Sequence, residues 1–271
     1  MSDQNSTAAP MGPRRMGAVN WTGLWTLYLR EVRRFMKVYT QTLIAPLVTT
    51  LLFLAVFALA LGGQDRIVDG LPFTTFLAPG LIMMAIAQNS FANTSSSIVI
   101  AKVQGNIVDS LMPPLNAHEL VFGFAIGGMT RGVCVAVVVW AAMAVAVGIG
   151  VHSFAFVIFH GVMGALMLSL LGLAGGIWSE KFDHIAAVTN FVITPLAFLS
   201  GTFYSIQRLP EAAQVAAHLN PFFYMIDGIR YGFIGHADGS LAAGIAVMTG
   251  INAGLWRLCT WMFKTGYKLR D

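Results

Sequence analysis

Long apolar stretches separated by short polar segments make up most of the chain, and six of them are long enough to cross a membrane. A hydrocarbon core of about 30 Å requires about 20 helical residues. The six stretches cover residues 43–63, 73–99, 132–151, 153–178, 185–206 and 241–262. This pattern predicts an all-α membrane protein with six transmembrane helices.

The segment before the first span changes character at residue 21. Residues 1–20 are rich in Ser, Ala, Pro and Gly and show little periodicity, which predicts a disordered cytoplasmic tail. In residues 21–40, apolar residues such as Trp21 and Leu24 recur at helical spacing, opposite a basic stripe that includes Arg30. Such an amphipathic helix is typical of the membrane interface. Anchoring on anionic lipid and docking of a cytoplasmic partner both fit this helix.

Three residues are expected to disturb the regular spans. Pro46 falls in the first turn of the first span, where a missing backbone donor costs least, and Pro195 invites a kink in the fifth. The apolar run 120–151, interrupted only by Arg131, would make about 48 Å of helix, which exceeds the hydrocarbon core. Because an arginine at the bilayer centre costs about 3 kcal/mol, we expect Arg131 near the inner interface. The third span would then begin at residue 132, after a shallow approach.

The second span becomes polar at its inner end. The sequence "QNSFANTSSS", residues 88–97, has eight polar residues among ten. In a membrane these side chains need hydrogen-bond partners or water. Bonds to neighbouring helices and the lining of a translocation path both meet that need.

The largest inner loop, residues 102–118, contains a short amphipathic helix. The stretch "NIVDSLM" places Ile107, Val108, Leu111 and Met112 on one apolar side, with Asp109 and Ser110 opposite. A short helix cannot bury an apolar side by itself, so this side needs another surface. The bundle and a separate subunit are both candidates for that surface.

The long outer segment, residues 208–235, contains two helical pieces that are too short to cross. Pro210 and Pro221 each begin one of them, which predicts short re-entrant helices between spans five and six. In the second piece, Asp227 and Arg230 lie three residues apart, a spacing that allows an ion pair. A structural pair and a charged outer gate both fit this spacing.

Composition and charge place the whole chain in a membrane. Of its 271 residues 56% are hydrophobic and 10% charged, with mean hydropathy +0.71, whereas soluble domains carry roughly 25% charged residues. With both termini cytoplasmic, eleven basic residues lie on the inner side and three on the outer side. This distribution follows the positive-inside rule, so the net charge of +4 indicates topology and no nucleic-acid partner is expected.

The sequence has none of the usual patterns of a membrane enzyme. It lacks a His-Glu-x-x-His motif, a Gly-x-Ser-x-Gly elbow, a phosphate-binding loop and a Cys/His cluster, so we expect no catalytic residue, metal or cofactor in this chain. Cys134 and Cys259 fall within spans and are read as packing residues. The six apolar cores hold no mid-membrane ionisable residue of the kind that secondary carriers use. Energy for transport would therefore come from another chain.

Several blocks in the order of the chain resemble one known family. They are "EVRRFMKVYTQTLIAPL", "FLAPGLIMM", "GNIVDSLMPPL", "GGMTRGV", "FVITPLAFLSGTFYSIQRLP" and "LNPFFYMIDGIRYGF". Together they resemble the ABC-2 family, the permease subunits of bacterial ATP-binding-cassette exporters, with the transmembrane domain at residues 33–266. Members commonly have an Arg and a Glu in the inner loop, where this sequence has Lys102 and Asp109.

The resemblance implies a permease of the bacterial inner membrane that works with a cytoplasmic ATP-binding subunit. ATP and Mg would be bound by that subunit, two permease copies would form a homodimer, and the cargo would be amphipathic or lipid-linked. The coupling segment would contact the ATPase through Gly105, Ile107, Asp109, Leu111, Met112 and Pro113. The outer re-entrant pieces would form a gate that includes Asn220, Pro221, Asp227 and Arg230.

We further expect the translocation path to be lined by the second and fifth spans. The candidate lining residues are Asn89, Asn93, Ser96, Asn190, Thr194 and Phe198. Two other classes of protein remain as alternatives. A self-contained secondary carrier or channel would transport without ATP, and a membrane scaffold or assembly factor would not transport at all.

Overall fold

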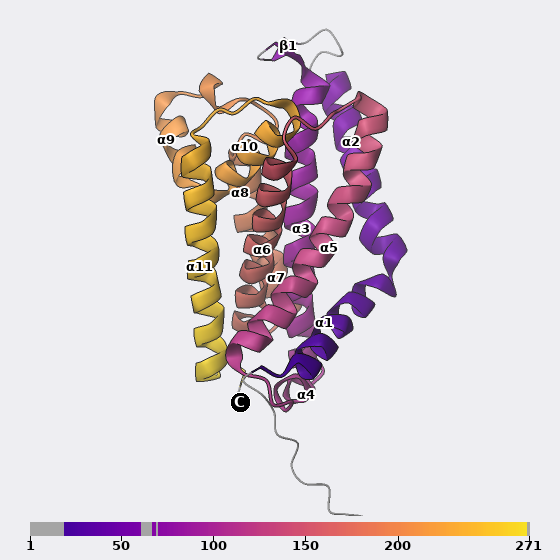
Figure 1. Ribbon diagram of the computed structural model, residues 1–271, viewed down its shortest axis with the longest axis vertical. Helices are drawn as coiled ribbons and strands as arrows, with labels where there is room; N and C mark the ends of the chain where they lie inside the picture. Colours follow the sequence, from indigo (N-terminus) through magenta and orange to yellow (C-terminus); the bar gives the residue numbers. More distant parts are fainter. Residues whose placement is uncertain (1–18, 61–66, 69, 270–271) are drawn as a thin grey trace, which may run out of the picture.

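The helices of the computed structural model follow the apolar pattern of the sequence (Figure 1). The structure describes residues 19–60, 67–68 and 70–269, so the predicted tail lies outside it except for its last two residues. The helices before the second span are α1 Trp21–Met36, the π-helical segment η1 Thr40–Ile44 and α2 Ala45–Ala60, followed by the hairpin β1 Ile67–Val68 and β2 Leu71–Pro72. Then come α3 Phe73–Val103, α4 Ile107–Leu111, α5 Ala117–Val147, α6 Phe154–Trp178, α7 Phe182–Val188 and the π-helical η2 Thr189–Ile193. The chain ends with α8 Thr194–Leu199, η3 Ile206–Arg208, α9 Glu211–Leu219, α10 Pro221–Ile234 and α11 Leu241–Thr265.

Six helical segments within the described residues are long and apolar enough to span a membrane, which confirms the predicted fold class. They are Thr40–Ala60, Phe73–Val103, Ala117–Val147, Phe154–Trp178, Phe182–Leu199 and Leu241–Thr265. In the most apolar window of α3, 83% of the residues are buried, against 11% in the first and fifth spans. Helix α3 is therefore the centre of the bundle, and the first and fifth spans lie at its edge.

Small residues allow the neighbouring helices to approach α3 closely. A Cβ atom at Gly132 of α5 would lie 2.0 Å from Ser90 Oγ, and one at Gly172 of α6 would lie 2.5 Å from the Phe91 carbonyl oxygen. Such close backbone approach is the usual way that helices associate in a membrane. It also lets Thr94 Oγ1 donate a 2.7 Å hydrogen bond to the Ser169 carbonyl. Part of the polar run of α3 thus serves packing.

The first and fifth spans each contain a π-helical turn just before a proline. Segment η1, Thr40–Ile44, precedes Pro46, and η2, Thr189–Ile193, precedes Pro195. Proline lacks the backbone N–H and crowds the carbonyl four residues earlier, and a one-residue widening of the helix relieves that conflict. The first span begins at Thr40, so Pro46 lies further inside it than the sequence suggested. Pro195 disturbs the fifth span as expected.

The third span differs most from its predicted course. Helix α5 is continuous over 31 residues, about 46 Å, with no break before residue 132. Arg131 is the fifteenth of these residues and lies in the middle of the helix. The helix therefore does not break before the third span as the shallow approach would require, and the depth of Arg131 in the membrane stays a prediction. The tilt of α5, which leans away from α3 and α6, accommodates the length of this helix (Figure 1).

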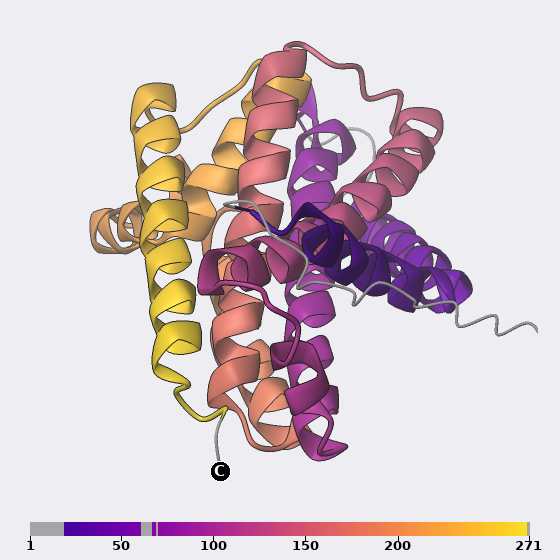
Figure 2. The ribbon, with the colours of Figure 1, turned by 60° about the horizontal axis from the view of Figure 1, so that its bottom comes forward.

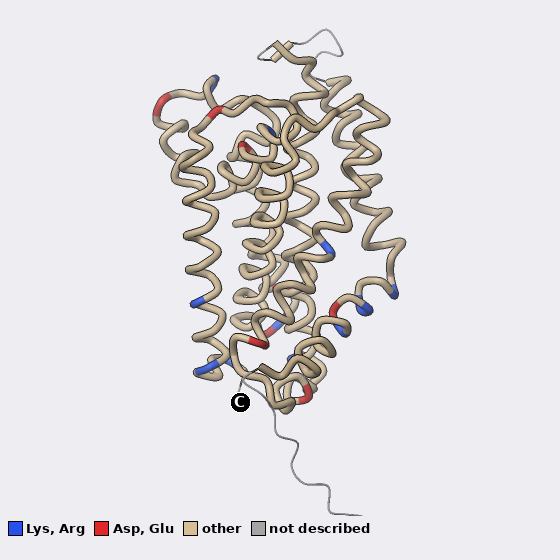
Figure 3. Tube along the Cα trace, in the orientation of Figure 1, with Lys and Arg blue, Asp and Glu red and all other residues tan. Residues whose placement is uncertain are grey.

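The two ends of the bundle carry different elements. Helices α1 and α4 and the end of α11 lie at one end, the lower end in Figure 1 and the front in Figure 2, where α1 runs across the bundle. The hairpin and the short helices α9 and α10 lie at the other end. Charged residues concentrate at these ends, as Figure 3 shows. Helix α1 is amphipathic as predicted, with Leu24 and Phe35 buried and Trp21 and Trp25 exposed.

Candidate functional site

The short helix α4 divides its side chains between the bundle and the exterior. Ile107 and Leu111 are half-buried and pack against the apolar cluster between α1 and α5. Val108 and Met112 are 54% and 75% exposed, and Asp109 is exposed beside them. The apolar side that the sequence indicated is therefore split, and Val108, Asp109 and Met112 form the free surface.

The other predicted coupling residues lie at the two ends of α4. Gly105 has a φ of +72°, a conformation that favours glycine, and forms the turn before the helix. Pro113 is exposed just after it. Lys102 caps the end of α6, because its ammonium donates to the carbonyls of Ile177 at 2.8 Å and Ser179 at 2.6 Å. This lysine therefore fixes the base of the segment to its neighbour.

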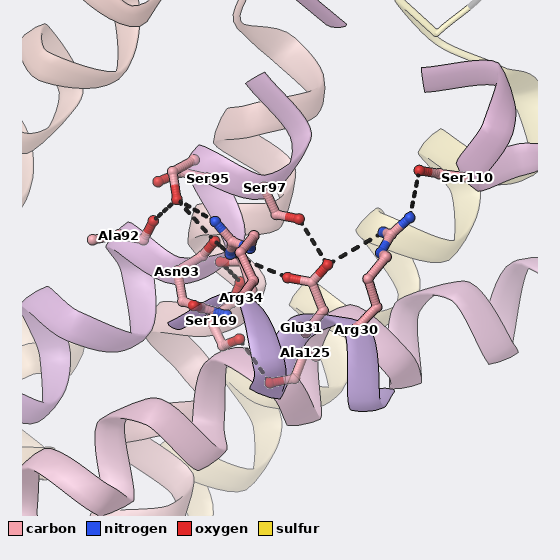
Figure 4. Close-up of polar contacts among 12 residues, drawn as sticks. Arg30, Glu31, Arg34, Ala92, Asn93, Ser95, Ser97, Ser110, Ala125 and Ser169 are labelled. Atoms are coloured by element: carbon pink, nitrogen blue, oxygen red, sulfur yellow. Dashed lines mark hydrogen bonds and ion pairs between the residues drawn. The ribbon is translucent and has the colours of Figure 1, made fainter. Parts of the chain in front are cut away.

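The buried face of α4 is tied to α1 by a polar contact that the sequence did not predict. Ser110 was expected opposite the apolar side of this helix, but it is only 6% exposed. Arg30 Nη1 donates to its hydroxyl at 2.9 Å. The same guanidinium pairs with Glu31 at 3.2 Å, and Glu31 is fully buried. Ser97 of α3 donates to the same carboxylate at 2.8 Å, as Figure 4 shows.

Arg34 completes this contact on the side of α3. Its Nη2 pairs with Glu31 at 3.1 Å and also donates to the Asn93 carbonyl, and its Nη1 donates to Ser96 Oγ at 3.1 Å. We call the set Arg30, Glu31, Arg34, Ser96, Ser97 and Ser110 the inner network. It joins α1 to α3 and α4 through hydrogen bonds from the charged side chains of α1 to serines on the other two helices. In the sequence, the signal was Glu31 itself, the only acidic residue of segment 21–40 among four basic ones.

The beginning of α5 belongs to the same assembly. Glu119 accepts the backbone N–H of Asn20 at 2.8 Å and that of Asn116 at 2.7 Å, so one carboxylate caps α5 and holds the start of α1. Further along, α1 rests directly on Gly127, where a Cβ atom would lie 2.5 Å from the Cβ of Glu31. Helices α1, α4 and the first half of α5 are therefore joined by direct contacts at this end of the bundle.

The candidate path residues do not share one cavity within the chain. Asn89 and Asn93 are buried on α3, and Ser96 is half-buried in the inner network. The cavity that includes Asn89 is lined by residues of η1, α2, α3 and α5, and by none of the fifth span. Asn190 is exposed at the surface of the fifth span.

The other two fifth-span candidates are half-buried. Phe198 stacks on Phe203 with ring centroids 5.1 Å apart, and Phe203 in turn stacks on Phe57 of α2 at 4.4 Å. Thr194 is the first residue of α8, directly before Pro195. The second and fifth spans thus present their candidate residues to different surroundings in a single chain.

At the outer end, Asn220 joins the fifth span to α10. Its side-chain oxygen accepts the Phe222 N–H at 3.0 Å and caps α10, which begins with Pro221. Its side-chain nitrogen donates to the Leu196 carbonyl at 2.9 Å and to Ser200 Oγ at 2.7 Å. One amide therefore holds the end of one helix against the start of the next.

The two charged residues of α10 are bound mainly to loops. Asp227 is 3% exposed and accepts the backbone N–H groups of Asp238 at 2.7 Å and Gly239 at 3.1 Å. Arg230 is 1% exposed, lies 3.9 Å from the Asp238 carboxylate and donates to the Gly201 carbonyl. Asp227 and Arg230 thus belong to a cluster centred on Asp238, which the sequence analysis did not single out.

Two further contacts close this cluster. The guanidinium of Arg230 stacks over the Phe76 ring of α3 at 4.2 Å, a cation–π contact. Asp238 accepts Ser205 Oγ at 2.9 Å and the Ile206 N–H at 3.1 Å. We call Asp227, Arg230 and Asp238 with these partners the outer cluster. It connects α3, α10 and the loops on either side of the outer segment.

Within the part of the chain that the structure describes, no three His, Cys, Asp or Glu residues come together in a way that could hold a metal ion. Cys134 and Cys259 are both free thiols, half-buried and buried respectively.

Comparison with known proteins identifies a family for this chain. Residues 22–234 match the model of the ABC-2 type transporter family. The chain is 37% identical over 251 residues to the inner membrane transport permease YadH of Escherichia coli (strain K12), which covers 93% of this chain and 98% of the relative. It is 26% identical over 247 residues to nodulation protein J of Rhizobium leguminosarum bv. trifolii, which covers 87% of each chain.

The family match extends over most of the chain, and the high coverage leaves no large part of either relative unmatched. The six spans, the amphipathic first helix and the inner helix α4 lie within that matched region or continue it to the end of the chain. The chain therefore belongs to the ABC-2 type transporter family and is a membrane-spanning permease subunit of an ATP-binding-cassette transporter.

Proposed function

We propose that this permease exports its substrate and is driven by ATP hydrolysis on a separate cytoplasmic subunit. ATP and Mg are bound by that subunit, since this sequence has no phosphate-binding loop. Binding of ATP closes two such subunits on each other, and the closure is passed to the permease. The permease then alternates between inward-open and outward-open states.

The free surface of α4 is the observation that carries this proposal. Val108, Asp109 and Met112 are exposed on a helix whose opposite face is fixed to α1 by Ser110 and Arg30. Methionine is enriched at protein interfaces, and a charged residue at the rim helps to fix how the partner is oriented. A displacement of α4 is transmitted to α1 and α3 through the side-chain contacts of the inner network and not through a flexible linker.

Two copies of the permease form the path. The first and fifth spans have only 11% of their most apolar windows buried in one chain, and the candidate residues of the second and fifth spans face different surroundings. A second copy placed against these spans would enclose Asn190 between two permeases. Two permeases also match the two ATPase subunits that close on each other.

The relatives support the assignment of the membrane, and the site supports the proposed class of cargo. The relative from Escherichia coli is named an inner membrane protein, and we assign this chain to the bacterial inner membrane. The buried amides of α3 next to apolar surface suit an amphipathic or lipid-linked cargo. The outer cluster and Asn220 act at the exit, where they hold α10 against the fifth span.

Affinity purification from the native host tests the proposal. We expect an ATPase subunit with a phosphate-binding loop to co-purify with the tagged permease. The paired substitutions Val108→Asp and Met112→Asp should abolish this association, because they place charge in an apolar contact. Leu219→Asp, at an exposed leucine of α9 at the other end of the bundle, is the control and should leave the association intact.

Proteoliposomes with the co-purified complex then test the energy source. ATP hydrolysis should be stimulated by a cargo from a panel of fluorescent lipids, glycolipids and hydrophobic dyes, and that cargo should accumulate in an ATP-dependent manner. Transport by the permease alone, without ATP, would identify a secondary carrier or channel. If no ATPase subunit co-purifies and no transport is detected, the protein is a scaffold. Either outcome, transport without ATP or the absence of both signals, contradicts the proposal.

A further inference from the structure

Two cavities of the permease are each bounded on one side by α3. The first, the inner cavity, has a volume of about 720 Å³ and is bounded by α1, the end of α3 and α4. Its lining holds four basic residues, Arg30, Arg33, Arg34 and Lys37, and only two acidic ones, Glu31 and Asp109. Since Glu31 already pairs with two of the arginines, the cavity keeps an excess of positive charge.

The second cavity lies deeper in the bundle, between the first span, α3 and α5. It has a volume of about 370 Å³, and its polar lining residues include Gln41, Gln88, Asn89 and Arg131. No acidic residue lines it. We call it the membrane cavity, because each of its walls belongs to a spanning helix.

A row of polar groups on α3 runs between the two cavities: Asn89 lines the membrane cavity, Ser97 lines the inner cavity, and Asn93 lies buried between them. Asn89, Asn93 and Ser97 are four residues apart and therefore lie on one face of the helix. Arg131 donates to Asn89 Oδ1 at 3.1 Å at the inner end of the membrane cavity, and Arg34 donates to the Asn93 carbonyl next to the inner cavity. The arginines thus stand one helical turn apart along the row.

The groups in this row have unused hydrogen-bonding capacity. Asn93 is fully buried, and neither its side-chain nitrogen nor its oxygen has a partner among the described residues. The Nε of Arg131 is likewise buried without an acceptor, and no described acidic residue lies within ion-pair distance of its guanidinium. Native proteins leave few buried polar groups unsatisfied, and an unpaired arginine in a membrane is retained mainly for function.

We propose that this row binds the phosphate headgroup of an anionic amphiphile, with Arg131 as its deepest ligand. A guanidinium donates two parallel hydrogen bonds to a phosphate, and the free amide of Asn93 supplies a further donor along the way. The apolar tail lies against Phe53, Leu81 and Met84, which line the membrane cavity. The inference rests on the proposed transport function and narrows its cargo to amphiphiles that carry a phosphate.

Equilibrium binding to the purified full-length permease, in neutral detergent and without the ATPase subunit, tests this site. The probe is dioctanoyl phosphatidate, with dioctanoylglycerol as its uncharged analogue and inorganic phosphate as competitor. We expect the phosphatidate to bind at least tenfold more tightly than the analogue. Arg131→Gln should weaken its binding at least tenfold, and Arg131→Lys should lose less, because the charge remains.

A control variant and a second variant guard against a folding artefact. Arg257→Gln removes an exposed arginine of α11 and should leave binding unchanged. Asn89→Asp places a carboxylate next to Arg131, so it should occupy the guanidinium and also abolish binding while the protein elutes as a single folded species. Each variant is checked by its elution volume and unfolding temperature.

Three results would overturn the proposal. They are unchanged phosphatidate binding in folded Asn89→Asp or Arg131→Gln, equal binding of dioctanoylglycerol, and displacement of the phosphatidate by an equal concentration of inorganic phosphate. The last result would assign the row to a free anion. None of these results depends on the ATPase subunit, so a failure here is distinguishable from a failure of ATP-driven export.

Discussion

The inner network and the outer cluster are both built from charged residues in an apolar bundle, but they differ in how far they are closed. At the outer end, Arg230 and Asp238 are each 1% exposed, and Asp227 is bound by two backbone N–H groups. At the inner end, Glu31 is fully buried, whereas Arg30 and Arg34 are 45% and 30% exposed beside a cavity of about 720 Å³.

This difference gives the two regions different roles: the outer cluster is a fixed joint between helices, and the inner network transmits movement. A buried ion pair that has lost water is costly to break, so the outer cluster holds α3, α10 and the nearby loops in one arrangement. The half-exposed arginines of the inner network can exchange partners with water or with an incoming anion at little cost. Charged residues in the membrane protein thus stabilise one end and leave the other able to respond.

The largest expected effect is the loss of the buried acid in the outer cluster. Asp238→Ala removes the carboxylate that lies 3.9 Å from the buried guanidinium of Arg230, and breaking a buried ion pair costs about 3–5 kcal/mol. The unfolding temperature in detergent should fall by several degrees, and α10 should become accessible to protease. Glu211→Gln, an exposed acid on the adjacent α9, is the control and should change neither measurement. A variant as stable as the control would show that the outer cluster is not a joint.

A smaller loss is expected from Gly127→Ala, where α1 rests on α5. The new methyl group would lie 2.5 Å from the Glu31 Cβ, and overpacking of this kind costs about 1–3 kcal/mol. ATPase stimulation by the permease should fall with it, because α1 is displaced. The matched control is Gly254→Ala in α11, which has open space around it and should be neutral or slightly stabilising. Equal behaviour of the two variants would contradict the close packing of α1 on α5.

Glu31→Gln sharpens the comparison, because it removes charge while it keeps an acceptor for Ser97. Both arginines can turn to water, so the loss of stability should be only about 1 kcal/mol. Coupling should suffer more than stability, measured as the ratio of cargo transported to ATP hydrolysed. Asp183→Asn in α7, also at the inner end, is the control. A large fall in unfolding temperature with intact coupling would make the inner network a second joint.

The smallest effect is expected from the exposed pair of Glu180 and Lys268. Lys268 donates to Glu180 at 2.9 Å, and this hydrogen bond lowers the pKa of the carboxyl. A lowered pKa means that the contribution is present at neutral pH and is lost only as pH falls through the folded-state pKa. Because both groups are in water, Glu180→Gln should not change the unfolding temperature measurably at pH 7. A clear drop would show that this pair holds the end of α11.

The periodicity of the sequence was sufficient for the helices and their order, because long apolar runs have no alternative to helix in a membrane. Arg131 shows what that pattern leaves out. Its cost in lipid argued for the interface, but the polar face of α3 and Asn89 provide a partner in the middle of α5. A hydropathy pattern contains no information on which helix supplies such a partner.

For the same reason, only part of the candidate site could be predicted from the sequence. Asp227 and Arg230 drew attention as charges in an apolar segment, but Asp238, eleven residues from Asp227, depends on how the outer loop folds back. On α4, a helical repeat alone could not tell which apolar residues face the bundle, because Ser110 is drawn inward by Arg30, eighty residues away. Roles in transport stay predictions for Gly105, Ile107, Asp109, Leu111, Met112 and Pro113.

Labelling of Val108→Cys by a membrane-impermeant maleimide tests the central claim most directly, that α4 receives the force of a separate ATPase. In the permease alone the cysteine should react fully, as expected for a side chain that is 54% exposed in the native residue. In the complex with the co-purified ATPase subunit it should be protected at least tenfold, and Leu219→Cys at the other end should react equally in both. Equal labelling of Val108→Cys with and without that subunit would contradict the account.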